Sequence, residues 1–406
     1  MSVEFPLCRQ PNHEAAIRSA LAECVAVVTE RLAAPQLVAI VLTGSFARGE
    51  GTVLPIGDTL RVLGDFEFFV VLSGRPDAGL RRQMTAWGRE ASARLATLGV
   101  RVDVEFGPVG LSFFRYRARP SIFVHDLRHH GKVLWGRPDA LDLVPWFETG
   151  AIPRDDAVRL IFNRMIEQLA TWERLERLDG DELLDAAYQR LKLTLDVAGS
   201  ALAFAGMHTS IYRERPAAFA RLLAETPSLE TALPIEFTDE LERAAQAKLD
   251  PAAAMETLGP PGPAHDPRLW LRRRMLSAVP VTTAVLGWEL QQLLETRGDL
   301  PALLTRYAHR ASLGRRAWDW AKLFLNPLPA PLPISHLRAA QLFWWSTPRG
   351  LVYAAGGHAY RELGRRASAR EELTHLLPLP THARPRDASA QRRAIVALWQ
   401  WSLRNT

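Results

Sequence analysis

The chain has 406 residues, 48% hydrophobic and 23% charged, a mixture typical of a globular protein rather than of a disordered or fibrous one. This length exceeds what a single hydrophobic core usually serves, and it predicts two or three domains. The net charge of +6 permits an anionic ligand such as a nucleotide. For a chain of this length, it does not favour nucleic acid unless the basic residues gather in one patch.

Cysteine content and hydropathy indicate the compartment. Cys8 and Cys24 are the only cysteines, which excludes a disulfide framework or a four-cysteine zinc site within one chain. The N-terminus lacks a basic region followed by an apolar one, so no signal peptide is expected. No run approaches 18 apolar residues. We therefore expect a cytoplasmic protein with no membrane partner.

The first third of the chain alternates helical and strand patterns. Apolar residues recur at helical spacing after Asn12 until Pro35 ends the run, and a β-branched strand then leads to the turn Gly44-Ser45. Two short strands about Gly57-Asp58 predict a hairpin inserted before the next strand, which Gly64 opens. The later elements expected here are a strand over 65–72, a helix over 80–98, a strand over 100–106 and a further short strand or helix pair over 121–134.

From Arg154 onward the pattern is helical almost without interruption, and the stretch LGPPGPAHDP is the clearest break in it. The predicted fold class is α+β: an N-terminal mixed β-sheet with flanking helices, followed by a large all-α region. The predicted organisation is a catalytic domain over 1–137, a linker over 138–153, a helical domain over 154–258 and a Trp/Arg-rich helical region over 259–406.

Two of the predicted strands carry carboxylates. Residues two apart on a strand share a face, so Asp65 and Glu67 point the same way, roughly 6.5–7 Å apart at Cα. The same alternation places Asp103 and Glu105 on one face. Carboxylates on strands that are otherwise apolar are costly unless they are paired or bind a metal. Their oxygen ligands suit Mg²⁺ or Mn²⁺.

The order Gly44-Ser45, Asp65-Phe66-Glu67 and then Asp103 in VDVEF resembles the polymerase-β-like nucleotidyltransferase superfamily. The resemblance covers about the first third of the chain and implies a nucleotidyltransferase-type sheet. It implies a metal-dependent enzyme that transfers an NMP from an NTP to an acceptor hydroxyl and releases pyrophosphate. It also implies that Asp65, Glu67 and Asp103 are catalytic and hold Mg²⁺ or Mn²⁺, while Gly44 and Ser45 bind the triphosphate.

The sequence departs from that family pattern in two respects. Nineteen residues separate Ser45 from Asp65, a gap longer than usual for the family. The predicted hairpin absorbs the surplus, and an acceptor-binding role for this loop stays open. The third acid is also ambiguous, because Glu105 shares the face of Asp103; we take Asp103 as the third acid and Glu105 as the alternative metal ligand.

Two basic residues are further candidates for binding the nucleotide. Arg48 lies beside the proposed phosphate turn, where it either binds phosphate or pairs with Glu50 and fixes the loop. Lys192, on a helical pattern of the following region, is the candidate to complete a triphosphate pocket, and a solvated helix face is its alternative. Both interpretations remain open for each residue.

His125, His129 and His130 invite a metal interpretation, but the spacing lacks a second ligand pair, so surface or capping histidines are predicted. Tryptophans and arginines interleave in the C-terminal third, and helical spacing favours a core with a solvated rim over a nucleic-acid face. A small-molecule acceptor is therefore expected. The alternatives are a protein- or tRNA-modifying enzyme and a non-catalytic nucleotide- or partner-binding module of the same fold.

Overall fold

The structure is a computed structural model and describes residues 5–260, 262, 265–325, 330–364 and 375–405. Part of the predicted LGPPGPAHDP break and part of the C-terminal region therefore lie outside the described residues. The chain divides into two compact units, and each is described by itself. Unit 1 comprises Met1–Asp156, Ala205–Phe219 and Leu241–Leu258; unit 2 comprises Ala157–Phe204, Ala220–Glu240 and Gly259–Thr406. Segments of 154–258 thus occur in both units.

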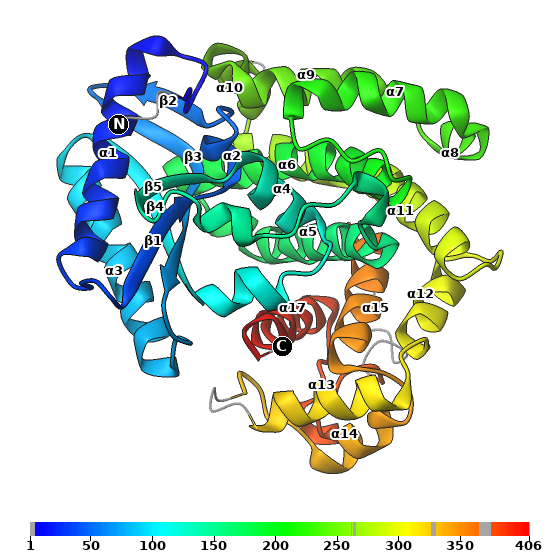
Figure 1. Cartoon of the computed structure of the whole chain (residues 1–406). Coiled ribbons are helices and arrows are strands. Elements are labelled where there is room, and N and C mark those ends of the chain that lie inside the picture. The colour runs from blue at the N-terminus through cyan, green and yellow to red at the C-terminus, as the bar shows by residue number, and fades with distance from the viewer. Residues whose placement is uncertain (1–4, 261, 263–264, 326–329, 365–374, 406) are drawn as a thin grey trace. The chain divides into compact units, whose positions relative to one another are not determined.

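Unit 1 contains the sheet (Figure 1). Its elements are α1 (Pro11–Thr29), β1 (Leu37–Leu42), α2 (Gly44–Ala47), β2 (Thr52–Ile56), β3 (Thr59–Leu72), α3 (Ala78–Thr97), β4 (Val100–Gly110), η1 (Phe113–Arg117), α4 (Ile122–His130), β5 (Lys132–Gly136), η2 (Ala140–Leu143), η3 (Thr149–Ala151), η5 (Tyr212–Glu214) and α10 (Pro251–Leu258). Helices α5 (Arg154–Arg174), α7 (Arg215–Glu225) and α9 (Phe237–Leu249) contain residues of both units.

Strand β3 is the longest strand, and it pairs with three others. Its first residues pair with β2 and its last residues with β1, both antiparallel, while β4 runs parallel to it along the other edge. Strand β5 extends the sheet beyond β1 as an antiparallel neighbour. The sheet is therefore mixed, as predicted.

The predicted hairpin forms between β2 and β3. The prediction that its second strand and the acidic strand are two separate strands is wrong. Residues 59–72 form one continuous strand, with Gly64 inside it at φ +103°. The register with β4 shifts between Arg61 and Asp65, so Gly64 lies at an irregularity of the ladder rather than at a strand end. Only glycine adopts such a φ readily, which is why a strand-breaking residue occurs inside this strand.

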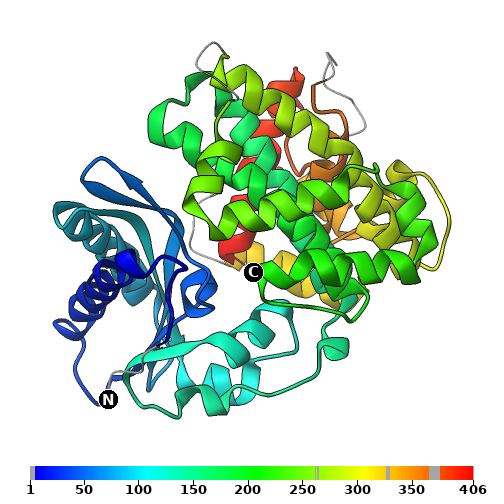
Figure 2. The same ribbon diagram turned by 90° about the horizontal axis from the view of Figure 1, so that it is seen from above.

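The sheet has an apolar core on each face. On one face, Phe66, Phe68 and Phe106 pack with buried residues of α1 and α3, and Figures 1 and 2 show both helices on this side of the sheet. On the other face, residues of β1 and the end of β3 pack with η1, α4 and η2. The acidic positions of β3 and β4 alternate with the buried phenylalanines, so they lie on the second face, outside this smaller core.

The segment from 121 to 136, predicted as a short strand or helix pair, forms a helix followed by a strand. Ser121 caps α4 by accepting a hydrogen bond from the Val124 backbone N–H at 3.1 Å. Gly131 ends the helix, and β5 follows directly.

The regular elements of unit 2 are all helices in the part of the chain that the structure describes, which confirms the predicted α+β class. Besides its parts of α5, α7 and α9, it contains η4 (Leu175–Arg177), α6 (Gly180–Phe204), α8 (Pro227–Ala232), α11 (Pro267–Leu293), α12 (Leu300–His309), α13 (Leu313–Leu325), α14 (His336–Phe343), α15 (Pro348–Arg361), η6 (Thr381–Ala383) and α17 (Ala388–Asn405). Among the described helices, none combines the length and apolarity needed to span a membrane.

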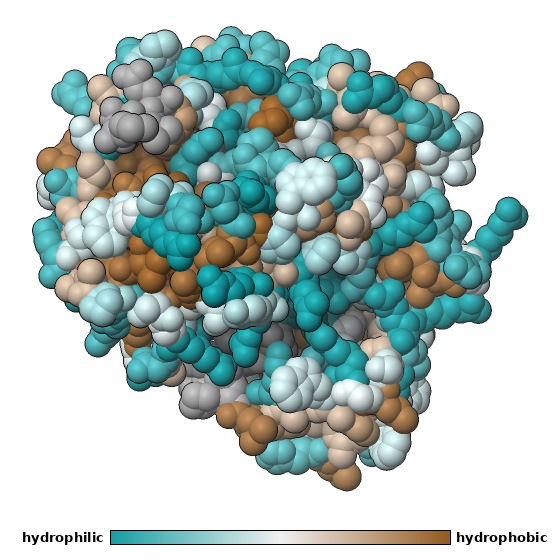
Figure 3. Space-filling view, viewed as in Figure 1, coloured by the Kyte–Doolittle hydropathy of each residue, from teal (hydrophilic) through white to brown (hydrophobic). Residues whose placement is uncertain are grey.

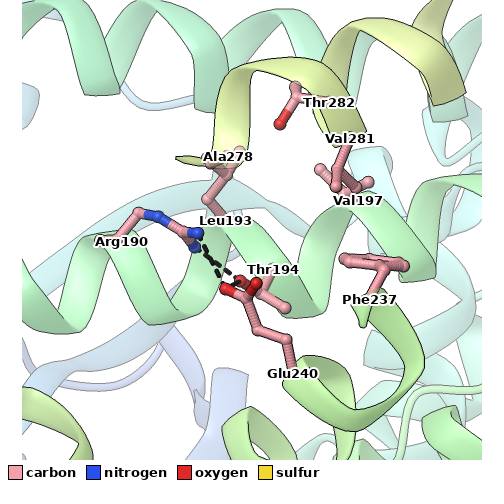
Figure 4. A pocket seen from close by; sticks show the side chains of 9 residues that line it. All are labelled: Arg190, Leu193, Thr194, Val197, Phe237, Glu240, Ala278, Val281 and Thr282. Atoms are coloured by element: carbon pink, nitrogen blue, oxygen red, sulfur yellow. Dashed lines mark hydrogen bonds and ion pairs between the residues drawn. The ribbon is translucent and has the colours of Figure 1, made fainter. Parts of the chain in front are cut away.

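A small pocket lies among α6, α9 and α11 of unit 2 (Figure 4). Arg190 is buried there and donates to Glu240 at 2.8 Å and to Thr194 at 2.6 Å. The ion pair lines the pocket together with the hydroxyl-bearing Thr194 and Thr282 and with apolar residues that include Phe237 and Val281.

The surface of unit 2 carries scattered apolar side chains at α13 and α14. Leu325 and Leu337 are 83% and 74% exposed, and Trp318 and Trp344 are also exposed. Figure 3 shows brown apolar atoms interspersed with teal polar ones where these two helices lie. Core packing, which the helical spacing of the C-terminal tryptophans predicted, therefore holds for Trp399 and Trp401 but not for Trp344 and Trp345, which are exposed.

Candidate functional site

The parallel pairing of β3 with β4 brings the predicted acids into register. Asp65 pairs with Asp103, and Glu67 pairs with Glu105. In-register residues of neighbouring strands project to the same face, so all four carboxylates belong to one acidic face. The intervening Phe66 is fully buried on the opposite side, which fixes the register against a slip by one residue.

The acids of this face influence one another electrostatically. The pKa of Glu105 is raised, first by partial burial of its carboxyl and then by the negative charges of Asp65 and Asp103. A face on which carboxylates repel one another gains stability from a cation, and oxygen donors in this number suit a hard divalent ion. The donor set therefore fits Mg²⁺ or Mn²⁺.

The turn after β1 lies against this acidic face. Gly44 has φ +71°, and a Cβ built there would lie 2.7 Å from Oε2 of Glu67. The preceding Thr43 donates its backbone N–H to the Glu67 carbonyl oxygen at 2.8 Å and its hydroxyl to Glu67 Oε2 at 3.4 Å. Gly44 therefore lies against Glu67, and the absence of a side chain at Gly44 makes the close approach of the carboxylate feasible. Gly44 and Ser45 begin the short helix α2, where a turn followed by a loop was predicted; binding of the triphosphate by these two residues stays a prediction.

Glu50 and Lys248 fix the loop that follows the turn. The backbone N–H of Glu50 donates to the Ser45 carbonyl oxygen at 2.9 Å, which closes the loop. The Glu50 carboxylate accepts from the backbone N–H of Tyr212 at 3.0 Å and from that of Arg213 at 3.4 Å. Buried Lys248 donates to the Glu50 carbonyl oxygen at 2.8 Å. None of these long-range contacts was predicted, since they join residues more than 160 positions apart.

Arg48 lies within this loop in a buried, charged environment. Its guanidinium is 3.9 Å from Glu50, 3.4 Å from Asp126 and 5.2 Å from the centre of the Tyr212 ring. Burial alone would lower the pKa of Arg48, but Tyr212 and Asp126 raise it, with smaller contributions from Glu50 and Glu67. The contacts are those of a loop-fixing residue, which was the alternative interpretation; phosphate binding by Arg48 stays a prediction.

Asp126, on α4, is a polar residue that the sequence did not single out. His208 Nε2 lies 2.8 Å from its Oδ1, and the hydroxyl of Ser210 donates to the same oxygen. Burial alone would raise the pKa of Asp126, but the neighbouring His125, the hydrogen bond with His208 and the charge of Arg48 hold it well below the ordinary value. Only the neighbouring histidines in VHDLRHHG could have marked this position in the sequence.

The predicted histidines differ in their surroundings. His125 is buried, so the prediction of a surface or capping residue is wrong for it; His129 is exposed and stacks on His125 with ring centres 4.0 Å apart. Lys192 lies on α6 of unit 2, half-buried, and its role in binding a nucleotide stays a prediction.

Comparison with known proteins gives a weak likeness among solved structures. No family model matches the chain, and no curated protein matches it. Among solved structures, the chain is similar to spectinomycin adenyltransferase AAD(9) from Enterococcus faecialis, solved with ATP and spectinomycin. The identity is 13%, the TM-score is 0.36, and the match covers 63% of this chain and 98% of that one. A likeness of this strength does not define a family for the chain.

Proposed function

We propose that the chain is a metal-dependent nucleotidyltransferase that transfers an NMP group from an NTP to an acceptor hydroxyl and releases pyrophosphate. The observation that carries the proposal is the register of β3 with β4, which places four carboxylates on one face while Gly44 lies against Glu67. An acidic face beside a glycine turn supplies ligands for divalent ions together with backbone that can approach a phosphate closely.

In this proposal, Asp65, Glu67 and Asp103 would hold the divalent ions, with Glu105 as the alternative third ligand. When bound, divalent ions would neutralise the negative charge that develops on the attacking and leaving oxygens during in-line displacement at phosphorus. The carboxylate of Asp103 would accept the proton of the acceptor hydroxyl. The Ser45 hydroxyl and the backbone N–H groups that follow Gly44 would donate to phosphate oxygens and orient the triphosphate.

The acceptor in this proposal is a small molecule. The net charge of +6 is modest for a chain of 406 residues, which gives little electrostatic support for a nucleic-acid acceptor. Such an acceptor needs only a local site, since it does not require an extended basic surface.

The test combines metal-dependent nucleotide binding with turnover. The purified chain is titrated with each NTP by calorimetry, with and without Mg²⁺, and is then incubated with NTP and mixed acceptor extracts while pyrophosphate is followed. Asp65→Asn and Glu67→Gln should each abolish metal-dependent binding and turnover. Asp58→Asn removes an exposed acid in the β2–β3 turn and should leave both unchanged. NTP binding that is the same with and without Mg²⁺, or turnover by Asp65→Asn, would overturn the proposal.

The same assay separates the two candidates for the third acid. Asp103 is in register with Asp65, whereas Glu105 is in register with Glu67. We expect Asp103→Asn to abolish turnover and Glu105→Gln to reduce metal affinity while some turnover remains. The reverse pattern would assign the third acid to Glu105.

A further inference from the structure

The segment 205–219 carries two side chains that converge on α4. It follows α6 in the chain and is part of unit 1, although the helices before and after it contribute to unit 2. Thr149 holds its start by donating a hydrogen bond to the Gly206 carbonyl oxygen at 2.7 Å. His208 and Ser210 then both reach Asp126. His208 and Ser210 therefore form one polar cluster with Asp126 inside unit 1.

The donor atoms in that cluster are close enough to share one ion. His208 Nε2 lies 2.8 Å from Asp126 Oδ1, and His125 Nδ1 lies 3.6 Å from the same oxygen. One donor atom from each of the three residues lies within 4.8 Å of the other two. Ligands that surround zinc tetrahedrally at 2.0–2.1 Å stand about 3.3 Å apart. The two distances to Asp126 Oδ1 lie on either side of this value, and the two histidine nitrogens lie within 4.8 Å of each other.

Burial and hydrogen bonding also suit a metal ligand set. His125 and His208 are each 8% exposed. Within the part of the chain that the structure describes, His125 Nδ1 is buried without a hydrogen-bond partner, because Asp126 Oδ1, at 3.6 Å, lies beyond hydrogen-bond distance. Arg48 contacts Oδ2 of Asp126 and leaves Oδ1 directed at the histidines. A ligating carboxylate held at its second oxygen is the usual outer-shell arrangement of a metal centre.

We propose that His125, Asp126 and His208 form a transition-metal site of the zinc class, which fixes the segment 205–219 to α4. Two imidazoles and one carboxylate favour zinc or a similar borderline ion, whereas Mg²⁺ prefers oxygen ligands alone. The site is distinct from the acidic face in its donor atoms, and it leaves a fourth position for solvent or the Ser210 hydroxyl. It does not depend on the proposed nucleotidyl transfer.

The experiment uses the full chain without a histidine tag, stripped with a chelator and titrated with Zn²⁺ alone by calorimetry. One equivalent should bind, and Co²⁺ in its place should give the visible absorption of a four-coordinate site. His208→Gln should weaken Zn²⁺ binding by more than about 100-fold, beyond the 10- to 100-fold that loss of an outer-shell residue costs. His13→Gln, on α1, is the matched control and should bind as the wild type.

Two further measurements separate the outcomes. Asp65→Asn should bind Zn²⁺ as the wild type does, and an excess of Mg²⁺ should not displace Zn²⁺. The Zn²⁺ result therefore stands even if the chain shows no nucleotidyl transfer. Zn²⁺ should raise the thermal midpoint of the wild type but not that of His125→Gln. Absence of Zn²⁺ binding by the folded wild type, or equal binding by His208→Gln and His13→Gln, would establish instead that the cluster is held by hydrogen bonds alone.

Discussion

Replacing Gly44 by alanine separates the conformational role of this glycine from its contact with Glu67. Alanine at φ +71° takes a left-handed conformation that costs roughly 1–2 kcal/mol. Its Cβ would lie 2.7 Å from Glu67 Oε2, whereas ordinary contact begins at 3.4 Å, so the carboxylate must move by about 0.7 Å. Because this shift acts through a proposed metal ligand, we expect Mn²⁺ affinity to fall about 10- to 100-fold.

Gly57 offers a matched control for this substitution. It has φ +58° in the β2–β3 turn, and a Cβ there would meet no atom within 4 Å. Gly57→Ala should therefore lose a similar free energy of unfolding in urea, with Mn²⁺-dependent NTP binding unchanged. If Gly44→Ala and Gly57→Ala bind Mn²⁺ and NTP equally well, the contact between Gly44 and Glu67 has no role in the site and the reasoning is refuted.

Two predictions concern unit 2. Burial raises the pKa of Glu289 to about 8, and a hydrogen bond from Ser200 opposes the shift. The unfolded chain therefore releases this proton at a pH near the ordinary pKa of about 4.3, whereas the folded chain releases it only near pH 8. Between these two pH values the folded state binds more protons, so the free energy of unfolding falls as pH rises, by at most about 1.4 kcal/mol per pH unit from this carboxyl. Urea unfolding across this range should show a smaller decline for Glu289→Gln, and an identical decline would contradict the assignment. Glu240→Ala leaves buried Arg190 without its carboxylate and should cost about 3 kcal/mol in the same assay, whereas Glu242→Ala, exposed on the same helix, should cost less than about 0.5 kcal/mol.

The acidic face could be predicted from the sequence because a strand has a period of two. Asp65 and Glu67 alternate with phenylalanines, and burying those aromatics leaves the acids no other face. The continuity of β3 through Gly64 could not be predicted in this way. Glycine weakens a strand pattern, and only the pairing with β2 and β4 on both sides of Gly64 shows that the strand continues.

The cluster at Asp126 lay beyond local pattern for a different reason. Asp126 and His208 are 82 residues apart, and the segment carrying His208 follows a long helix of the other unit. Periodicity reports which face of its own element a residue occupies, but it carries no information about which distant segment meets that face. From the sequence, the histidines near Asp126 were possible metal ligands, but the ligand from a distant segment, His208, could not be identified.

The loop from Gly44 to Glu50, whose first four residues form the short helix α2, connects the two candidate sites of unit 1. At its start, Gly44 lies against Glu67 of the acidic face; at its end, Glu50 accepts the backbone N–H groups of Tyr212 and Arg213. Between them, the charge of Arg48 interacts with both Glu67 and Asp126. Because the loop is short and buried, fixing the segment 205–219 at Asp126 also restricts the position of the turn beside Glu67. The proposed zinc-class ion would therefore act on the acidic face through preorganisation of this loop, without contact with the nucleotide.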